Sequence, residues 1–330
     1  MGVGSGIGAT LGIGPESSYG TGGSVVKWPE FTKETIVRTP KRVQPNGLAG
    51  GLLLPRASQR VQTTLDAQGD VETPFYQLGL GHFLAALMGS SAAPAQQAST
   101  TAYKQTHTLG NDAGISKQIQ VGRPSLDGTV RPFTYSGVKV LSGKFECGLD
   151  EDLTSTFSID AQAVDDSTAL TAASYVSPNP PFHFGQMTIK LGSYGSESVI
   201  SGIRKVSCTI TKKARTDRFY ADGTGKKAEP ILNDKYQISG SFDTDFVNAT
   251  DFVNRFRDDT LTSAVITWTG ATIASTYAYT FQINLPGLKF DTGDPTVGGP
   301  DIIQPSIGWT CDYDDAHLPS LVYMNTETAL

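Results

Sequence analysis

The sequence predicts a mainly β protein. Residues 235–246 alternate apolar or small residues with polar ones, and a period of two is typical of a strand with one buried and one solvated face. Related stretches occur at 69–75, 153–163 and 307–313, each with an acid on its polar side. The 36 glycines and 18 prolines suit many turns, and abundant serine and threonine favour strands over helices.

Length and charge narrow the class of protein further. A chain of 330 residues exceeds the usual single core, so we expect two packed units or one unusually large β domain. The net charge of −6 argues against a protein that grips nucleic acid, which requires a basic face. No apolar run approaches the roughly 20 residues that span a bilayer, and the N-terminus lacks the basic start of a signal peptide. We therefore expect a soluble, cytosolically made chain without membrane insertion.

The first 60 residues contain two segments that are predicted to need a binding partner to become ordered or covered. Residues 1–24 are rich in glycine and serine and are predicted to form a flexible N-terminal arm. A strand follows around Ile36, and residues 40–59 then form a loop that carries Leu52, Leu53 and Leu54. Three exposed leucines in a loop indicate a surface that another subunit covers.

Two short helices are predicted, each after a strand. Leu80, Phe83, Leu84 and Leu87 share one helical face that Gly89 can end. A second face, formed by Phe252, Val253 and Phe256, follows the strand at 240–246. Because this strand-then-helix pattern occurs twice, 171 residues apart, it indicates an internal duplication.

A second repeat supports the duplication. Residues 136–142 match 201–207 at an offset of 65, and in both copies the apolar positions change parity within the strand, which predicts a β-bulge. The strands that follow match at an offset of 83. We therefore expect a β domain at 25–317 built from two related halves, 25–166 and 182–317, joined by the proline-rich linker 167–181. The C-terminal tail 318–330 is predicted to lie on another subunit.

The second half contains an insertion at 212–232 that is rich in cations. It is either a solvated hairpin tip or a docking loop for an acidic surface on a neighbouring copy, where charge complementarity would set the register between subunits. The residues predicted for such contacts are Lys212, Lys213, Arg215, Arg218, Lys226 and Lys227.

Residues with catalytic or metal-binding chemistry are sparse. Cys147, Cys208 and Cys311 have apolar neighbours two residues away, so buried reduced thiols are predicted rather than disulfides or a zinc site. There is no nucleophile elbow, no phosphate-binding loop and no paired histidines. The sequence therefore predicts a protein that is not an enzyme and that has no cofactor and no metal.

Four stretches, in order along the chain, resemble a known family. They are Gly12–Thr21, Gly69–Thr73 with Gly81–Ser90, Thr134–Val140, and Ile283–Leu288. Together they are similar to the tail tube protein, or major tail protein, of long-tailed, non-contractile (siphovirus-type) bacteriophages. The glycine-rich residues 1–11 and the insertion at 212–232 depart from this pattern.

The resemblance implies a β-sandwich or partial barrel with one or two short flanking helices. It implies that six copies close into a ring whose inner strands form one β-barrel, and that rings stack around a tape measure protein. Tail terminator and distal tail proteins would lie at the ends, and double-stranded DNA would later pass through the lumen. The protein would assemble in the host bacterial cytoplasm and reside in the virion tail.

We hypothesise that the polar strand faces line this channel, with Glu72, Asp160 and Asp243 among the lining acids. Six chains would bring a formal charge of −36 per ring (6 × −6), and such a lining would let polyanionic DNA slide. Two alternatives remain open. One is another virion component, a decoration or tail terminator protein. The other is a carbohydrate-binding or hydrolytic β-sandwich, although the aromatic residues follow core parity instead of forming a platform.

Overall fold

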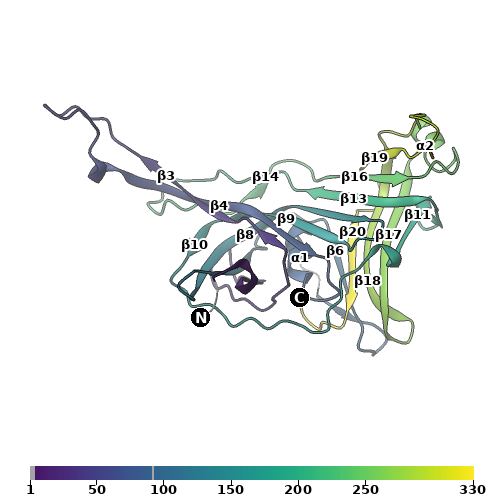
Figure 1. The fold of residues 1–330 in the computed structure, drawn as a ribbon, viewed down its shortest axis with the longest axis horizontal. Coiled ribbons are helices and arrows are strands. Elements are labelled where there is room, and N and C mark those ends of the chain that lie inside the picture. Colours follow the sequence, from purple (N-terminus) through teal and green to yellow (C-terminus); the bar gives the residue numbers. More distant parts are fainter. Residues whose placement is uncertain (1–3, 91–92) are drawn as a thin grey trace.

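An antiparallel sheet, here called the long sheet, runs along the longest axis of the molecule (Figure 1). It is seen in a computed structural model that describes residues 4–90 and 93–330. A short strand, β2 (Lys33–Glu34), also pairs with β4 of this sheet. In spatial order the main strands are β3 (Val37–Val43), β4 (Val61–Pro74), β9 (Thr154–Ala161), β8 (Val130–Gly148), β13 (Ile203–Thr211), β16 (Gln237–Thr244) and β19 (Ser306–Cys311).

Strand β8 is long enough to belong to two sheets. Its residues 139–148 lie in the long sheet, whereas residues 130–138 pair with β7 (Lys117–Pro124) and β10 (Ala163–Asp165). Strand β7 in turn pairs with β1 (Thr10–Pro15). The first half of the chain therefore has a small sheet that folds away from the long sheet through one shared strand.

A third sheet stands across the far end of the long sheet (Figure 1). Strand β18 joins the two sheets, because its residues 288–290 pair with β19 and its earlier residues pair with β17 and β20. In spatial order this sheet contains β12 (Ser198–Val199), β11 (Met187–Gly192), β17 (Thr262–Ala274), β18 (Tyr277–Phe290), β20 (Ser320–Asn325), β6 (Tyr103–Thr108) and β5 (Ala95–Gln96).

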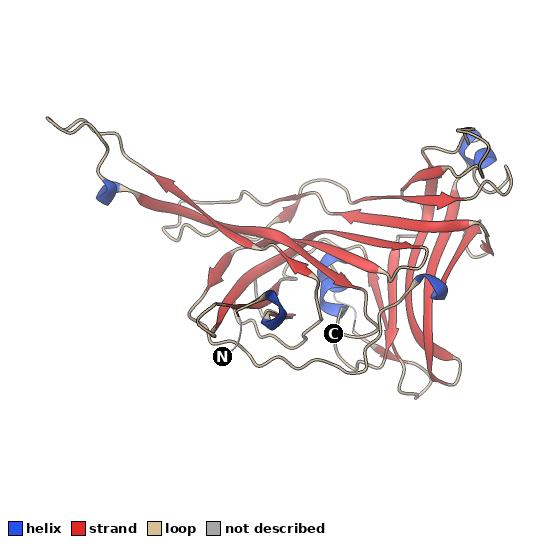
Figure 2. Ribbon diagram, viewed as in Figure 1, coloured by secondary structure: helices blue, strands red, loops and turns tan. Residues whose placement is uncertain are grey.

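Strands dominate the molecule, and helices are few and short (Figure 2). The helices are α1 (Gly81–Met88), α2 (Val253–Arg257) and the 3₁₀ turns η1 (Gly6–Gly8), η2 (Ala57–Gln59) and η3 (Phe184–Gln186). A two-stranded ribbon, β14 (Ala214–Arg215) with β15 (Ile231–Leu232), closes the base of the predicted insertion. The predicted mainly β, sandwich-like fold with short helices is confirmed, and among the described residues the sheets of one chain do not close into a barrel.

Helix α1 fills the space beneath the long sheet. It lies where the sequence predicted it, ends at Gly89 with φ of 67°, and packs against β8, β6 and β1. All eight of its residues are buried, so it is a core helix rather than a surface helix. Its Phe83 stacks on Phe157 of β9 at 4.7 Å, and a Cβ added to Gly143 of β8 would lie 2.4 Å from the Leu87 side chain. The glycine therefore permits the close approach of strand and helix.

The predicted bulges are confirmed in both copies of the repeat. The pairing register shifts between Val140 and Ser142 where β8 meets β9, and between Ile203 and Lys205 where β13 meets β16. A bulge reverses which side of the strand each later residue faces. This explains the change of parity in the sequence.

The strand pairs also match at the predicted offsets. Gly143 pairs with Phe157 in β8–β9, and the residues 65 and 83 positions later, Cys208 and Gly240, pair in β13–β16. These four strands agree with an internal duplication, which stays a prediction for the two halves 25–166 and 182–317. The repeat at an offset of 171 would make β4 the counterpart of β16. However, β16 lies between β13 and β19 in the same way that β9 lies between β8 and β4, so β9 is the counterpart of β16 and the offset of 171 has no such support. Residues 167–181 form neither strand nor helix.

The N-terminal segment is part of the fold. Strand β1 pairs along its length with β7, and its Leu11 and Ile13 side chains are fully buried. A Cβ added to Gly14 would lie 1.8 Å from the Ser24 carbonyl oxygen, so the glycine serves close backbone packing rather than flexibility. The prediction of a flexible arm at 1–24 is wrong for residues 10–15, and its first three residues lie outside the described residues.

The C-terminal tail also folds onto its own chain. Strand β20 lies between β18 and β6, with Leu321 and Tyr323 buried. Beyond it, a Glu327 carboxylate oxygen forms an ion pair with Lys27 Nζ at 2.5 Å. The prediction that residues 318–330 lie on another subunit is wrong for β20, because both of its partner strands, β18 and β6, belong to the same chain.

The three cysteines are free and buried, as predicted. Burial raises the pKa of Cys311 to about 12, and it raises the pKa of Cys147 as well. A thiol with a raised pKa is a poor nucleophile at neutral pH. These side chains therefore act as small apolar residues of the core.

We predict that Tyr323→Ala destabilises the monomer. The Tyr323 ring is fully buried against Phe75 at 5.7 Å, and its hydroxyl donates a hydrogen bond to the Tyr76 carbonyl at 2.9 Å. Loss of this ring should lower the free energy of unfolding by roughly 3–5 kcal/mol, measured by urea denaturation. Thr328→Ala, which truncates an exposed side chain of the same tail, is the control and should change it little. Equal effects of the two variants would contradict the buried position of β20.

Stability should fall on acidification because two histidines are buried without charge. Burial, aided by the nearby charge of Lys117, lowers the pKa of His82 to about 3 and that of His107 to about 4. The unfolded chain takes up these protons near pH 6.5, so the stabilisation is complete above pH 6.5 and is lost as the pH falls towards 4.

Each of these histidines should make the free energy of unfolding at pH 4.5 roughly 2–3 kcal/mol lower than at pH 7. His82→Leu should therefore flatten the dependence of the unfolding free energy on pH, measured by denaturation between pH 4.5 and 7. His317→Gln, at the surface, is the matched control. An unchanged slope for His82→Leu would show that this histidine is protonated in the folded state.

Candidate interaction surfaces

The outer side of the long sheet is a continuous polar surface, here called the hydroxyl face. Because side chains alternate along a strand, each register row faces one side only. One outward row crosses the sheet from β4 to β19 and consists of Glu72, Thr156, Lys144, Thr209, Ser239 and Thr310. The next row, which is buried, consists of Val71, Phe157, Gly143, Ile210, Ile238 and Cys311. The sheet thus separates a dry side from a solvated side across its width.

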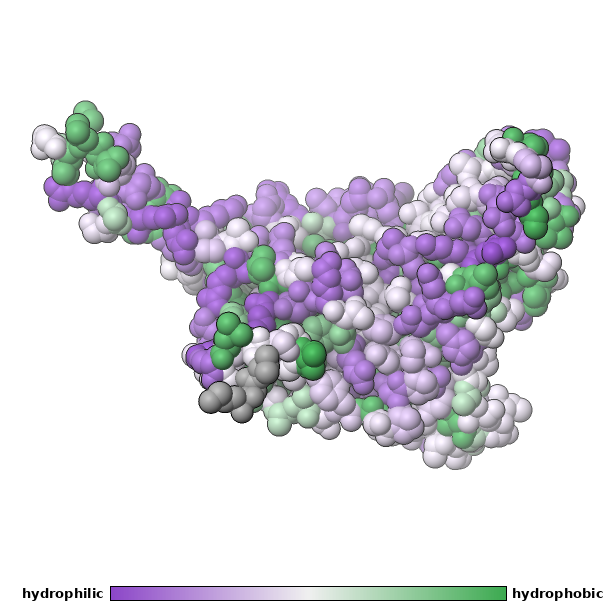
Figure 3. Space-filling model, in the orientation of Figure 1, coloured by the Kyte–Doolittle hydropathy of each residue, from purple (hydrophilic) through white to green (hydrophobic). Residues whose placement is uncertain are grey.

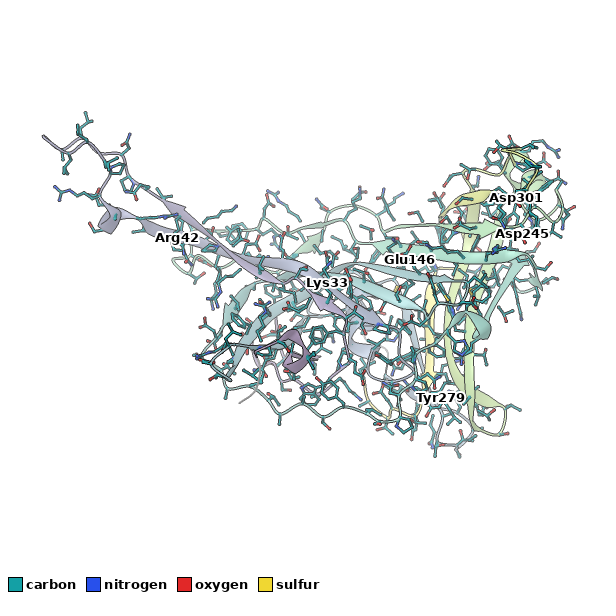
Figure 4. The ribbon with its side chains drawn as sticks, in the orientation of Figure 1. Lys33, Arg42, Glu146, Asp245, Tyr279 and Asp301 are labelled. Atoms are coloured by element: carbon teal, nitrogen blue, oxygen red, sulfur yellow. The ribbon has the colours of Figure 1, made fainter. Side chains whose placement is uncertain are left out.

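Acids and lysines are paired on the hydroxyl face. Lys33 Nζ lies 3.2 Å from a carboxylate oxygen of Glu72, and Lys144 Nζ lies 2.8 Å from one of Glu146. Lys33 and Glu146 both belong to the long sheet (Figure 4). These pairs are partly exposed and contribute little stability. Their effect is to leave the surface with a low net charge.

Asp243 also lies on the hydroxyl face. It accepts a hydrogen bond from the Ser306 hydroxyl at 2.6 Å, and its register partner on β13 is Lys205. Glu72 and Asp243 therefore project from the predicted polar strand face. The hydroxyl side chains that outnumber them were not predicted, although the serine and threonine content of the alternating segments was the signal.

Asp160, in contrast, is buried inside the chain. Lys227 Nζ donates to Asp160 at 2.6 Å and to Asp66 at 2.5 Å, and the Gln68 amide donates to the same Asp160 oxygen at 3.2 Å. Burial raises the pKa of Asp160, and the charge of Lys227 opposes this shift. The prediction that Asp160 lines a channel is wrong, because the insertion at 212–232 folds back and places Lys227 against it.

Lys212 is buried in the same way at the start of the insertion. Its Nζ donates to the Asp112 carboxylate at 2.7 Å and to the Ala86 carbonyl of α1 at 2.6 Å. Burial lowers the pKa of Lys212 to about 8. Nearby, the buried Lys139 Nζ lies 2.7 Å from Glu229 of the insertion. The prediction that Lys212 and Lys227 contact another subunit is wrong, because both anchor the insertion to the first half of their own chain.

The other cations of the insertion lie nearer the surface. Arg215 forms an ion pair with Asp217 at 2.8 Å. Lys213 and Lys226 are exposed, and Arg218 is partly exposed. Contacts of these four residues with another subunit stay a prediction.

The ends of β3 and β4 project beyond the body of the molecule and are joined by the loop 44–60, and residues 41–62 are here called the arm (Figure 1). Every residue of the arm is exposed. Leu53 is 97% exposed, Leu54 is 81% exposed and Leu52 is about half exposed, and apolar residues gather at the tip (Figure 3). The three leucines thus form an apolar surface that their own chain leaves uncovered.

The arm is also basic, which the sequence analysis missed. Between residues 41 and 62 there are four cations and no acid, namely Lys41, Arg42, Arg56 and Arg60. An acid-free run of this length in a chain with net charge −6 was the available signal. Within residues 4–90 and 93–330, none of the four forms an ion pair.

In the described part of the chain, no three histidine, cysteine or acidic side chains gather as a metal site. Nor does that part contain a helix long and apolar enough to cross a bilayer. The conspicuous surfaces are therefore the hydroxyl face and the arm.

Comparison with known protein families finds a match that covers most of the chain. The family described as phage tail tube protein matches residues 6–311, which include the long sheet, the arm and both helices. No curated protein is matched by this sequence.

Asp160→Ala should destabilise the chain by roughly 3–5 kcal/mol, because it leaves the buried Lys227 with one fewer partner. The free energy of unfolding of the monomer, measured by urea denaturation, tests this. Lys226→Ala removes an exposed cation next to Lys227 and is the matched control, with an expected change within about 0.5 kcal/mol. An Asp160→Ala variant with an unchanged free energy of unfolding would contradict the buried ion pair.

Proposed function

We propose, for a chain that belongs to the phage tail tube protein family, that its copies assemble as stacked hexameric rings into the tail tube of a siphovirus-type bacteriophage. Membership of this family makes the chain a structural component of the virion tail that assembles with copies of itself. The hexameric ring, its lumen and its role in DNA delivery are proposals beyond family membership. The hydroxyl face is the observation that supports them.

The free edge of the long sheet favours ring closure. Within the described residues strand β3 pairs with β4 only, so its other side offers unpaired backbone groups, whereas the opposite edge strand, β19, pairs with β18 as well as β16. Such edges pair readily with strands of other chains. If copies join edge to edge, their long sheets form one barrel, and the hydroxyl faces can line its interior. The buried side of each sheet, with α1 beneath it, then forms the wall.

The hydroxyl face suits the passage of DNA. Duplex DNA carries one negative charge per about 1.7 Å, and a surface rich in free cations would hold it at many points. Here Lys33 and Lys144 are paired with acids of the same chain, so few cations are free to bind phosphate. We place Glu72 and Asp243 in this lining and exclude the buried Asp160.

The tube has further proposed partners. The tape measure protein occupies the lumen before DNA enters, and the tail terminator and distal tail proteins bind the two ends of the tube. Assembly takes place in the cytoplasm of the host bacterium. The finished tube conducts double-stranded DNA into the next host cell without inserting into a membrane itself.

Negative-stain electron microscopy of the purified protein tests the assembly. We expect long hollow tubes under conditions that promote polymerisation. Single rings that do not stack would instead indicate a tail terminator, and unassembled subunits that bind only to preformed particles would indicate a decoration protein.

Glu72→Lys combined with Asp243→Lys should slow DNA ejection, because the added cations hold phosphates in the lumen. The rate of DNA release from purified virions, measured by dye binding, gives the result, and tail length should stay normal. The control is Glu72→Gln with Asp243→Asn, which removes the same acids without adding cations. Ejection as fast as in the control would argue against the lining role.

A further inference from the structure

We propose that Lys227 and Asp160 of one chain condense to an isopeptide bond, an amide that joins Lys227 Nζ to the Asp160 side-chain carbon Cγ and releases one water molecule. The bond ties the insertion at 212–232 to strand β9. It forms within a single subunit, so it does not depend on the proposed tube.

The two reacting side chains are completely enclosed. Those of Lys227 and Asp160 are both 0% exposed, and Lys227 Nζ lies 2.6 Å from Asp160 Oδ1. Because Cγ is bonded to that oxygen at about 1.2 Å, it lies less than about 4 Å from Nζ, close to the roughly 3–3.5 Å at which two reacting atoms are poised. Bulk water, which would hydrolyse the amide, has no access to either side chain.

The two carboxylate oxygens of Asp160 have unequal surroundings. Oδ1 accepts hydrogen bonds from Lys227 Nζ and from the Gln68 amide, the latter at 3.2 Å. Oδ2 is buried and accepts no hydrogen bond from the described residues. A buried oxygen without a donor is costly and needs an explanation. Condensation gives one, because it removes this oxygen as water and leaves a carbonyl oxygen that Gln68 still serves as donor.

Asp66 is placed to accept a proton from the nucleophile. Its Oδ1 lies 2.5 Å from Lys227 Nζ, so this amine contacts a second acid besides the one it attacks. Lys139, which is also buried, lies 2.7 Å from one carboxylate but 3.8 Å from another. Lys212 has a single carboxylate partner among the described residues. The pair of close acids therefore distinguishes Lys227 from the other buried lysines.

Atoms and protons balance without an added reagent. One proton moves from Lys227 Nζ to the Asp160 carboxylate, which gives a neutral amine and a neutral acid. The amine lone pair forms the bond to Cγ, and a second Nζ proton passes through Asp66 to the Asp160 hydroxyl group. The Cγ–O bond then breaks with its electron pair, and water leaves. Asp66 returns the proton that it accepted, so its role is catalytic.

The environment favours the neutral reactants and the product. Burial and the charge of Asp66 raise the pKa of Asp160, against the opposing charge of Lys227. Two charges taken out of water are expensive, and their mutual attraction often fails to offset that cost. The amide removes both charges, while its N–H can donate to Asp66 and its carbonyl can accept from Gln68. The product thus keeps the polar contacts of the reactants.

The bond joins two segments that are 67 residues apart. The chain between them contains the linker 167–181 and strand β13. The insertion runs beside β4 (Figure 1), and a Cβ added to Gly225 would lie 2.6 Å from the Thr63 carbonyl oxygen. With the bond in place, the insertion cannot leave the first half of the chain unless a covalent bond breaks.

The intact mass of the purified full chain, measured after denaturation, tests the proposal. We expect a mass lower by one water molecule than the sequence requires. Trypsin should release peptide 145–190, which contains Asp160, linked to peptide 227–235, in which Lys227 stays uncleaved. An intact mass without the loss of water, with cleavage after Lys227, overturns the proposal.

Three variants locate the bond. Lys227→Arg keeps the positive charge but removes the amine, so the full mass should return. Asp66→Asn keeps the size of the side chain but accepts no proton, and should slow bond formation by about 10²–10⁴-fold, the usual effect of a general base. Lys226→Arg changes the exposed neighbour and is the matched control, which should still lose one water molecule.

A loss of water that persists in Lys227→Arg places the dehydration elsewhere, for example as a succinimide at Asp127–Gly128 or Asp222–Gly223, and overturns the proposal. Bond formation at an unchanged rate in Asp66→Asn overturns the catalytic role of Asp66. Circular dichroism shows whether each variant is folded. If Lys227→Arg does not fold, the tryptic peptides of the unsubstituted chain decide the matter, because they require no variant.

Discussion

The alternation of side chains across the long sheet is the constraint on which the rest of the structure depends. One row of the sheet is buried against α1, and the adjacent row carries serine, threonine and paired charges. A shift of one residue in any strand would exchange the two rows. The bulges in β8 and β13 are tolerated because they lie near the ends of these pairings. The same register thus fixes both the core and the solvated surface.

Local features of the fold were predictable from sequence because local residues determine them. The helix at Gly81–Met88, its end at Gly89, the buried cysteines and the bulges all follow from spacing within a few residues. The positions of Glu72 and Asp243 on a polar face follow from strand period in the same way.

Features that depend on distant contacts could not be predicted. Lys212 and Lys227 have the sequence context of a solvated loop, yet each meets an acid that lies more than sixty residues away. The tail was expected to leave its subunit, yet β20 fills a position between β18 and β6, and β6 comes more than two hundred residues earlier. The glycines of residues 1–24 suggested flexibility, whereas Gly14 permits close packing. In each case composition was consistent with two structures, and only tertiary contacts distinguish them.

Strand β4 is continuous from Val61 in the arm to Pro74, next to Phe75 of the aromatic core. Where β4 is paired, load along the strand is transmitted through hydrogen-bonded backbone, whereas residues 44–60 beyond the two strands form a loop. Through β9 and β8 that load spreads into neighbouring strands within the same molecule. The paired part of each subunit is therefore built to be stiff along the direction of its strands.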